Sequence, residues 1–220
     1  MNTKTPHIIT EEGIEYHLGE LKSDHIHYDF KKILSYLQVK GKLLFGENFK
    51  IYEEDEVILF KLCIYFIEDE AYAKKLNIDL QKGILLSGPV GCGKTSLMKL
   101  LRHMVPHKKP YKIIPCRNTV FGFNHIGFKT IEDYGSENYY CLDDLGIEPT
   151  GRHFGKDCNV MGEILLSRYD LFAKSKIKTH ATTNLNAKEL EERYGIRVRS
   201  RMRELFNLIA FDKESMDKRK

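Results

Sequence analysis

Hydrophobic residues occur in this chain as short continuous runs separated by longer amphipathic stretches. The clearest run is Gly83-Ile-Leu-Leu-Ser87, and a short continuous run is typical of a strand buried on both faces of a parallel sheet. A glycine-rich loop follows it, and then a helix is predicted at about Lys94–Val105. The same alternation continues almost to the end of the chain.

The later predicted elements complete this alternating pattern. They are strands at Tyr111–Cys116, Tyr139–Asp143, Lys178–Thr183 and Asn207–Phe211, and helices at Asn159–Lys174 and Ala187–Tyr194, with mixed segments up to Tyr134. Strands that alternate with helices favour a sheet built from βαβ units. The predicted fold class is therefore α/β with a parallel sheet.

The first quarter of the chain has a different pattern. Residues 1–50 are rich in His and Lys, with one short helix predicted at Asp29–Gln38 and a loop marked by Gly41 and Gly46. A further helix is predicted at 53–76, because carboxylates crowd its first turn and an apolar stretch follows. We expect a small N-terminal segment (1–50), a main domain (51–212) and a basic C-terminal tail (213–220).

Composition narrows the class of protein. The chain has 220 residues, 42% hydrophobic and 30% charged, as in an ordinary soluble globular protein. Its first ten residues are polar, and no apolar run is long enough to span a bilayer, so we expect a cytoplasmic protein with no membrane contact. The five cysteines are scattered without a Cys-x-x-Cys pair, which favours reduced thiols over a zinc site or disulfides.

The net charge of +4 is modest but unevenly distributed. Basic residues crowd the last part of the chain: Arg193, Arg197, Arg199, Arg201, Arg203, Lys213, Lys218, Arg219 and Lys220. Such a cluster can meet the phosphates of a nucleotide or of a nucleic acid. A solvated basic surface is the alternative.

Residues 88–95, Gly-Pro-Val-Gly-Cys-Gly-Lys-Thr, satisfy the phosphate-loop pattern between a buried strand and a helix. Glycines let successive backbone N–H groups turn inward, and the helix directs its positive end to the same place. Lys94 is expected to reach the β- and γ-phosphates of ATP, and the Thr95 hydroxyl to bind Mg²⁺. The residues expected to contact the nucleotide here are Gly88, Pro89, Val90, Gly91, Cys92, Gly93, Lys94, Thr95 and Ser96.

Acidic and polar residues follow two of the predicted strands. Asp143 ends the strand from Tyr139 and is the expected Mg²⁺ partner, and Asp144 is placed to orient or deprotonate the attacking water. Many ATPases have Glu at the position of Asp144. The shorter Asp side chain is expected either to slow hydrolysis or to require a closer approach of the backbone to the water. A surface turn is the alternative. Asn184 follows Thr183 and is expected to hold the water, although it could equally cap the next helix.

With these elements placed, the chain resembles the AAA+ ATPases of the bacterial helicase-loader and transposition-helper group (DnaC/IstB-like). The resemblance covers about residues 50–220. Its matching stretches are Lys82–Thr95, Leu142-Asp-Asp-Leu-Gly146, Thr182-Thr-Asn-Leu185 and Tyr194-Gly-Ile-Arg-Val-Arg-Ser-Arg-Met-Arg203. The resemblance implies a P-loop fold of three layers, α/β/α, with ATP and Mg²⁺ as cofactors.

The resemblance also implies an assembly with the nucleotide at subunit boundaries. Arg201 matches the arginine finger that a neighbouring subunit supplies, with Arg197, Arg199 and Arg203 as nearby candidates and a basic amphipathic helix as the alternative. Arg219 matches a late arginine that contacts the phosphates in its own chain, with Lys218 one residue away; the alternative is a frayed tail.

The expected function is ATP binding and hydrolysis by a homo-oligomer, weak unless it is assembled or stimulated by DNA. The expected partners are single- or double-stranded DNA and a replicative helicase or transposase. Because helicase loaders generally carry a larger N-terminal region, the partner stays open. Three alternatives remain: a non-hydrolytic nucleotide switch or adaptor for a protein partner, a small-molecule kinase, and a DNA-binding adaptor.

Overall fold

A computed structural model of the chain describes residues 5–219. The chain forms two compact units, one made of residues up to 77 together with 96–110, the other of residues 78–95 together with those from 111 onward. Met1–Lys4, which begin the polar N-terminal stretch, and Lys220, which ends the predicted basic tail, lie outside the described residues. Among the described residues, no helix has both the length and the apolar character needed to cross a bilayer.

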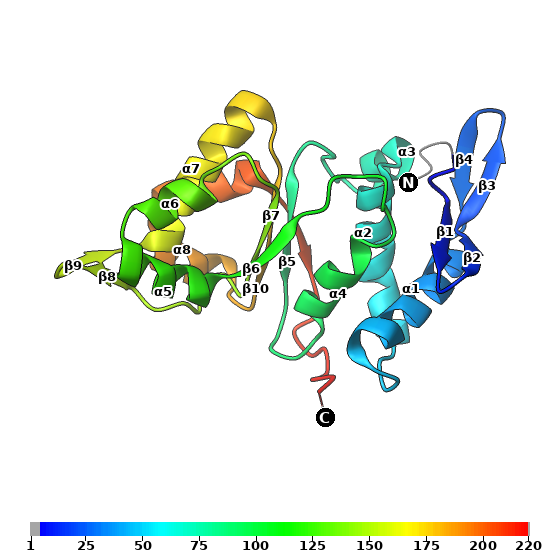
Figure 1. Cartoon of the computed structure of the whole chain (residues 1–220), viewed down its shortest axis with the longest axis horizontal. Coiled ribbons are helices and arrows are strands. Elements are labelled where there is room, and N and C mark those ends of the chain that lie inside the picture. The colour runs from blue at the N-terminus through cyan, green and yellow to red at the C-terminus, as the bar shows by residue number, and fades with distance from the viewer. Residues whose placement is uncertain (1–4, 220) are drawn as a thin grey trace. The chain divides into compact units, whose positions relative to one another are not determined.

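The second unit contains a five-stranded parallel sheet (Figure 1). Its strands are β5 (Gly83–Ser87), β6 (Lys112–Pro115), β7 (Tyr140–Asp143), β10 (Thr179–Thr183) and β11 (Phe206–Ala210). Their order across the sheet is β11-β5-β10-β7-β6, and every neighbouring pair is parallel. The α/β prediction is confirmed, and each predicted strand is found within a residue or two of its expected bounds.

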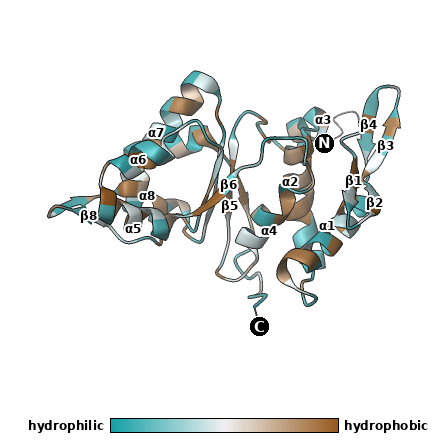
Figure 2. Ribbon diagram, viewed as in Figure 1, coloured by the Kyte–Doolittle hydropathy of each residue, from teal (hydrophilic) through white to brown (hydrophobic). Residues whose placement is uncertain are grey.

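The helices of this unit bury apolar faces against the sheet, whose strands are among the hydrophobic parts of the ribbon in Figure 2. They are α5 (Cys116–Ile126), α6 (Lys129–Tyr134), α7 (Val160–Ser175) and α8 (Ala187–Leu205). The unit also contains the first two residues of α4 (Lys94–Leu101). The predicted end of the last helix at Tyr194 is wrong as a terminus, because α8 continues beyond it. Gly195, with φ of 82°, breaks the helical geometry there, so the boundary marks a kink.

Two unusual contacts join β5 and β10 at the amino-terminal end of the sheet. A Cβ atom at Gly83 would lie 1.6 Å from the carbonyl oxygen of Thr179, so only glycine lets these strands approach as they do. One residue along, the N–H of Ile84 donates to Nδ1 of the buried His180 at 3.1 Å. A side chain thus replaces a ladder hydrogen bond at this point.

Arg168 on α7 is fully buried and ties three segments together. Its Nε donates to the Thr179 hydroxyl at 2.8 Å, and its other nitrogens donate to the carbonyls of Ser136 and Lys178. The guanidinium also lies 5.3 Å from the ring centre of Tyr140. Burial lowers the pKa of Arg168 to about 10, which leaves it charged at neutral pH. These contacts secure the start of β10 and the approach to β7.

A short hairpin that the sequence did not predict follows β7. It consists of β8 (Gly151–His153) and β9 (Lys156–Cys158), paired antiparallel. The ring of Phe123 on α5 packs near His153, with 6.0 Å between ring centroids. The hairpin therefore packs against α5 through His153 beside its tip, while Phe154 at the tip is 93% exposed.

The first unit is mainly helical, with two small hairpins near its start. Its elements are β1 (Ile8–Glu11), β2 (Ile14–His17), β3 (Gly19–Lys22), β4 (His25–Tyr28), α1 (Phe30–Phe45), η1 (Glu53–Asp55), α2 (Glu56–Ile67), α3 (Glu70–Lys75) and the later part of α4. Neither hairpin was predicted. The division of the chain at residues 50 and 212 stays a prediction.

Two predicted boundaries in this unit are wrong. Gly41 does not mark a loop but lies inside α1. A Cβ atom there would be 2.0 Å from the ring of Phe49, so a glycine at this position leaves the space that the ring occupies. The single helix predicted over 53–76 is interrupted at Glu68, which adopts the left-handed conformation with φ of 59°. Asp69 then caps α3 by accepting the N–H of Tyr72 at 2.9 Å.

Candidate functional site

The candidate site begins where β5 ends and the chain turns through residues 88–93 into α4. Gly91 and Gly93 have φ of 84° and 100°, a region that glycine adopts without strain. Strand, glycine-rich loop and helix start therefore follow one another as the motif requires. In such a turn the loop N–H groups and the positive end of the helix favour an anion.

Lys94 is held by the loop it follows. Its side chain is buried, and its Nζ donates to the carbonyl oxygens of Gly88 and Pro89, both at 2.8 Å. The ammonium group therefore lies against the first half of the loop, beside the place where the motif requires the phosphates. Carbonyl oxygens are weaker partners than phosphate oxygens for a cation, so a phosphate could take this ammonium over.

The two residues predicted to bind Mg²⁺ lie in direct contact. The Thr95 hydroxyl donates to Oδ1 of Asp143 at 2.8 Å, and the Thr182 hydroxyl donates to the same oxygen at 2.7 Å. Asp143 is buried. Hydroxyl and carboxylate oxygens are the ligands that Mg²⁺ prefers, so the donors present fit this cation. Among the described residues no cluster of three His, Cys, Asp or Glu side chains could hold a metal.

Thr182 is a site residue that sequence reasoning missed. Besides binding Asp143, its hydroxyl accepts the N–H of Asp144 at 2.9 Å. It occupies this position because β10 lies between β5 and β7 in the sheet. The available signal was the polar pair Thr182-Thr183 at the end of an otherwise apolar strand.

Asp144 stands at the open side of this arrangement. Its φ of 55° is in the left-handed region, at the sharp turn after β7. Partial burial, and then the neighbouring carboxylate of Asp143, raise the pKa of Asp144, while Lys94 and Arg219 oppose the rise. A carboxylate with a raised pKa is a stronger base, and Asp144 is also exposed to solvent.

Asn184 lies at the end of β10 beside the phosphate loop. The alternative that it caps α8 is wrong, because Asn186 is the cap and accepts the N–H groups of Lys188 and Glu189. Asn184 lines a cavity of about 520 Å³ together with Pro89. Its Oδ1 is buried and, within the described part of the chain, has no hydrogen-bond partner.

A buried acidic residue, also missed from the sequence, supports the loop after β7. Glu148 accepts the N–H of Gly146 at 2.8 Å and the hydroxyl of Tyr194 at 2.7 Å. Arg193 donates to its backbone carbonyl and lies 3.5 Å from its carboxylate. Burial, and then the charge of Glu148, raise the pKa of Tyr194. This network joins the loop that follows Asp144 to the first part of α8.

The predicted arginine finger lies away from the phosphate loop of its own chain. Arg201 donates to the Tyr169 hydroxyl and to Glu204, both at 3.1 Å, and its guanidinium lies 4.3 Å from the ring centre of Tyr169. Its side chain is 40% exposed. Arg197 and Arg203 are exposed as well. A role for Arg201 in a neighbouring subunit's site stays a prediction.

The C-terminal segment, in contrast, lies against the phosphate loop. Lys218 donates from Nζ to the carbonyl of Cys92 at 2.9 Å. Arg219 lies 3.9 Å from Asp217 and is one of the cations that oppose the rise in the pKa of Asp144. These contacts argue against a frayed tail for the described residues. A direct contact between Arg219 and the nucleotide stays a prediction.

Fold and site geometry together define the class: a parallel-stranded α/β protein with a phosphate-loop motif between β5 and α4. No protein-family model matches the chain, and no curated protein matches its sequence. Comparison with solved structures adds detail. The chain is similar to the DnaC helicase loader, with a TM-score of 0.53 and 18% identity over 76% of this chain and 95% of that one.

It is also similar to DnaI, with a TM-score of 0.54 and 18% identity over 75% of this chain and 89% of that one. A third similar structure is AMPPCP-bound DnaA from Aquifex aeolicus, with a TM-score of 0.51 and 18% identity over 76% of this chain and 49% of that one. At such identities the likeness establishes the fold. The resemblance to helicase loaders inferred from the motifs is confirmed at that level.

Proposed function

We propose that this protein binds Mg·ATP at the phosphate loop and hydrolyses it. The observation that carries the proposal is the convergence of Thr95 and Asp143, which come from different elements and share a hydrogen bond of 2.8 Å. A glycine-rich turn alone would not require a buried carboxylate at that place. Residues 88–96 would hold the phosphates, and Thr95 and Asp143 the cation.

Each remaining residue has a distinct task in this proposal. Mg²⁺, when bound, neutralises part of the phosphate charge. Lys94 exchanges its two loop carbonyls for phosphate oxygens, Asp144 accepts a proton from water, and Asn184 offers its unpartnered Oδ1 to orient that water. Arg201 of a second copy of the chain stabilises the charge that develops on the γ-phosphate, so full activity requires a homo-oligomer.

The proposed role is an AAA+ activity connected with DNA replication, exerted on DNA or on a DNA-bound partner such as a replicative helicase or transposase. The similarity in fold to helicase loaders and to DnaA supports the connection. A surface of the chain itself supports contact with single-stranded DNA. That surface is the exposed end of the second unit formed by the β8–β9 hairpin and the start of α6.

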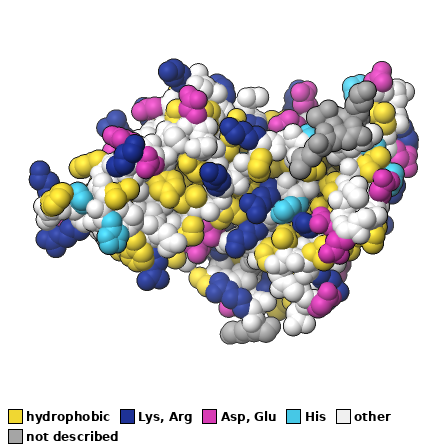
Figure 3. Space-filling model, viewed as in Figure 1, with side chains coloured by type: hydrophobic (Ala, Val, Ile, Leu, Met, Phe, Trp, Pro, Cys, Tyr) yellow, Lys and Arg dark blue, Asp and Glu magenta, His cyan; other side chains and the backbone are white. Residues whose placement is uncertain are grey.

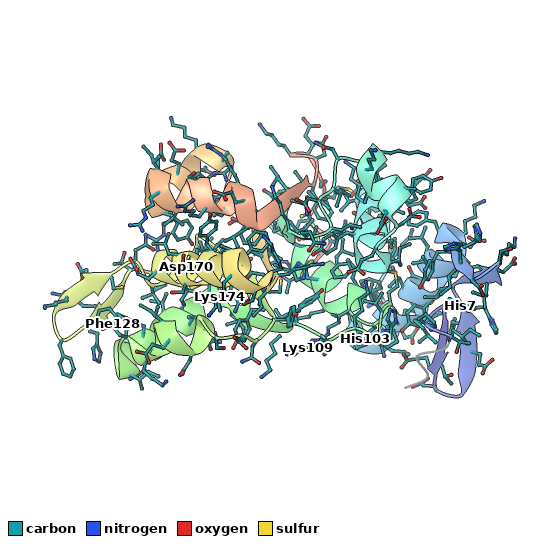
Figure 4. The ribbon with its side chains drawn as sticks, turned by 90° about the horizontal axis from the view of Figure 1, so that it is seen from above. His7, His103, Lys109, Phe128, Asp170 and Lys174 are labelled. Carbon is teal, nitrogen blue, oxygen red and sulfur yellow. The ribbon has the colours of Figure 1, made fainter. Side chains whose placement is uncertain are left out.

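Aromatic and basic side chains adjoin on this surface. Phe154 at the hairpin tip and Phe128 before α6 are 93% and 65% exposed. Arg152 and Lys156 flank the tip, and the ion pair of Arg152 with Asp157 joins two side chains that are each 71% exposed and is therefore weak. Figure 3 shows basic and hydrophobic side chains together at this end of the unit, and Figure 4 labels Phe128 there. Exposed rings between cations suit stacking on unpaired bases.

The test of hydrolysis is ATP turnover measured across a range of protein concentrations, with and without single-stranded DNA. Lys94→Ala should abolish turnover, whereas Lys99→Ala, at an exposed position in the same helix, should leave it unchanged. Turnover per subunit should rise with concentration if the chain assembles. A Lys94→Ala rate close to that of the unaltered protein would refute the assignment.

The DNA contact has its own test. Phe154→Ala should weaken binding of a fluorescent oligothymidine by about tenfold, as expected for the loss of one stacked base. Val57→Ala removes an exposed apolar side chain from the first unit and serves as the control. Equal affinity of the Phe154 variant and the unaltered protein would remove the hairpin from the DNA contact.

A nucleotide-dependent switch without hydrolysis is the second candidate, favoured by one observation. Asp144 carries the shorter of the two acidic side chains at the position of the proposed base. A switch would bind Mg·ATP and release no phosphate at any protein concentration, with or without DNA.

A further inference from the structure

The segment that follows β11 returns to the phosphate loop and packs against both of its halves. It begins at Phe211, whose N–H donates to the Ser87 carbonyl at 2.8 Å. Phe211 is buried, and a Cβ atom built at Gly88 would lie 2.7 Å from the Cβ atom of Phe211. The start of the segment is therefore fixed where the loop begins.

The second half of the loop is held by Lys218. Its backbone N–H donates to the Gly91 carbonyl at 3.1 Å, and its Nζ donates to the Cys92 carbonyl at 2.9 Å. The stem of Lys218 passes close to Gly93, and its ammonium lies 5.3 Å from the ring centre of Phe211. One residue thus binds two successive loop carbonyls.

Asp217 completes the contact. A Cβ atom at Gly91 would lie 2.0 Å from the Asp217 carboxylate, so this glycine is required for close packing as well as for its positive φ. The same carboxylate accepts the N–H of Arg219 at 3.1 Å. Residues 217–219 therefore form an ordered turn against the loop, which we call the C-terminal clip.

The clip acts on the loop through the geometry of the peptide bond. In a planar trans peptide the C=O and the following N–H point in opposite directions. A donor bound to the Gly91 carbonyl therefore directs the N–H of Cys92 to the other side of the loop, and a donor on the Cys92 carbonyl does the same for Gly93. Those N–H groups belong to the half of the loop that would surround the phosphates.

Two lysines then divide the loop between them. Lys94 binds the carbonyls of Gly88 and Pro89, and Lys218 binds those of Gly91 and Cys92. Their positions differ in one respect: Lys94 begins the helix and can move to a phosphate, while Lys218 already uses its N–H and its Nζ on the carbonyl side. Lys218 can therefore orient the loop amides without competing with them for the nucleotide, whereas Lys94 leaves its carbonyls when it binds a phosphate.

We infer that Lys218 is a positioning residue for nucleotide binding, which holds the amides of Cys92 and Gly93 toward the phosphates while itself contacting the carbonyl side of the loop. The inference rests on the proposed function of the loop. Its consequence is that the clip increases affinity for any Mg-bound nucleotide with at least two phosphates, and by the same factor for a diphosphate as for a triphosphate.

The experiment is titration calorimetry with Mg·ADP and with the Mg complex of the non-hydrolysable triphosphate AMP-PCP. Lys218→Met, which keeps the length of the stem, should weaken both by about tenfold, the size expected from one hydrogen bond with a charged donor. Lys218→Arg should restore most of the affinity, because a guanidinium can donate to the same carbonyl. Lys99→Met, at an exposed position in α4, is the control and should bind normally.

The outcomes separate the possibilities. Unchanged affinity of Lys218→Met for Mg·ADP overturns the inference, and so does an equal loss in the Lys99 control. A loss several-fold larger for the triphosphate than for the diphosphate also overturns it, because Lys218 would then contact the terminal phosphate directly. Melting without nucleotide should be the same for Lys218→Met as for the unaltered protein, since a general loss of structure would lower it. If the unaltered protein itself binds neither ligand, the proposed function fails rather than the clip.

Discussion

His180 makes the stability of the second unit sensitive to acid. Its Nδ1 accepts the N–H of Ile84 at 3.1 Å, and its ring lies 4.7 Å from that of Tyr111 in a buried environment. A nitrogen can accept this hydrogen bond only while it is unprotonated. Burial, followed by the positive charge of Lys178, lowers the pKa of His180 to about 3 from its usual 6.5.

The magnitude follows from the difference between the folded and unfolded pKa. Below pH 6.5 the unfolded chain takes up a proton at His180 that the folded chain does not, so the free energy of unfolding falls as the pH falls from 6.5 toward 3. Above pH 6.5 the contribution is fully present. Between pH 8 and pH 5 the loss from this single residue is about 2 kcal/mol, a large part of the stability of an ordinary domain.

Urea denaturation at pH 8, 7, 6 and 5 measures this effect when the protein is compared with His180→Asn. The Asn amide oxygen can accept the same N–H and does not titrate. The unaltered protein should lose about 2 kcal/mol more than the variant over this range. His25→Asn, at an exposed position, should follow the unaltered protein. Parallel stability curves for the unaltered protein and His180→Asn would refute the reasoning.

Three further predictions concern the site and its support. Thr182→Val removes one of two hydroxyls on the Asp143 carboxylate and should raise the Mg²⁺ concentration that half-saturates nucleotide binding by about tenfold; an unchanged Mg²⁺ titration would contradict a role in the metal site. Arg168→Met leaves one buried and two half-buried acceptors without their donor and should lower the free energy of unfolding by about 3 kcal/mol in urea, and a change below about 1 kcal/mol would contradict it. Mixing Arg201→Ala with Lys94→Ala subunits should restore part of the ATP turnover, because each variant keeps the half-site that the other lacks; a mixture as inactive as its parts would argue against a finger at Arg201 or against mixing.

Much of the sheet and the loop was predictable because its signals are local. One continuous stretch of sequence contains the apolar run of β5, the loop glycines and Lys94. Each part of this stretch predicts its own local conformation. Asp143 followed from a rule about strand ends, namely that polar residues there meet at one edge of a parallel sheet. The contact of Asp143 with Thr95 agrees with that rule.

The parts that could not be predicted depend on contacts between distant residues. Glu148 and Tyr194 are 46 residues apart, and the pairing of Lys218 with Cys92 spans 126. The hydrophobic periodicity of the sequence does not predict contacts between such distant residues. The break at Glu68 was missed for a different reason, because its left-handed backbone lies within an otherwise continuous helical pattern and no glycine or proline marks it.

Gly83 bears on how a mutational survey of this protein would have to be interpreted. Any side chain there would need to occupy space already taken by the Thr179 carbonyl, so almost every replacement should reduce the amount of folded protein. A survey scored by activity alone would rank position 83 beside Lys94 and suggest a chemical role. Scoring cellular abundance in parallel would tell them apart, since loss of the lysine should leave abundance intact while loss of the glycine should not.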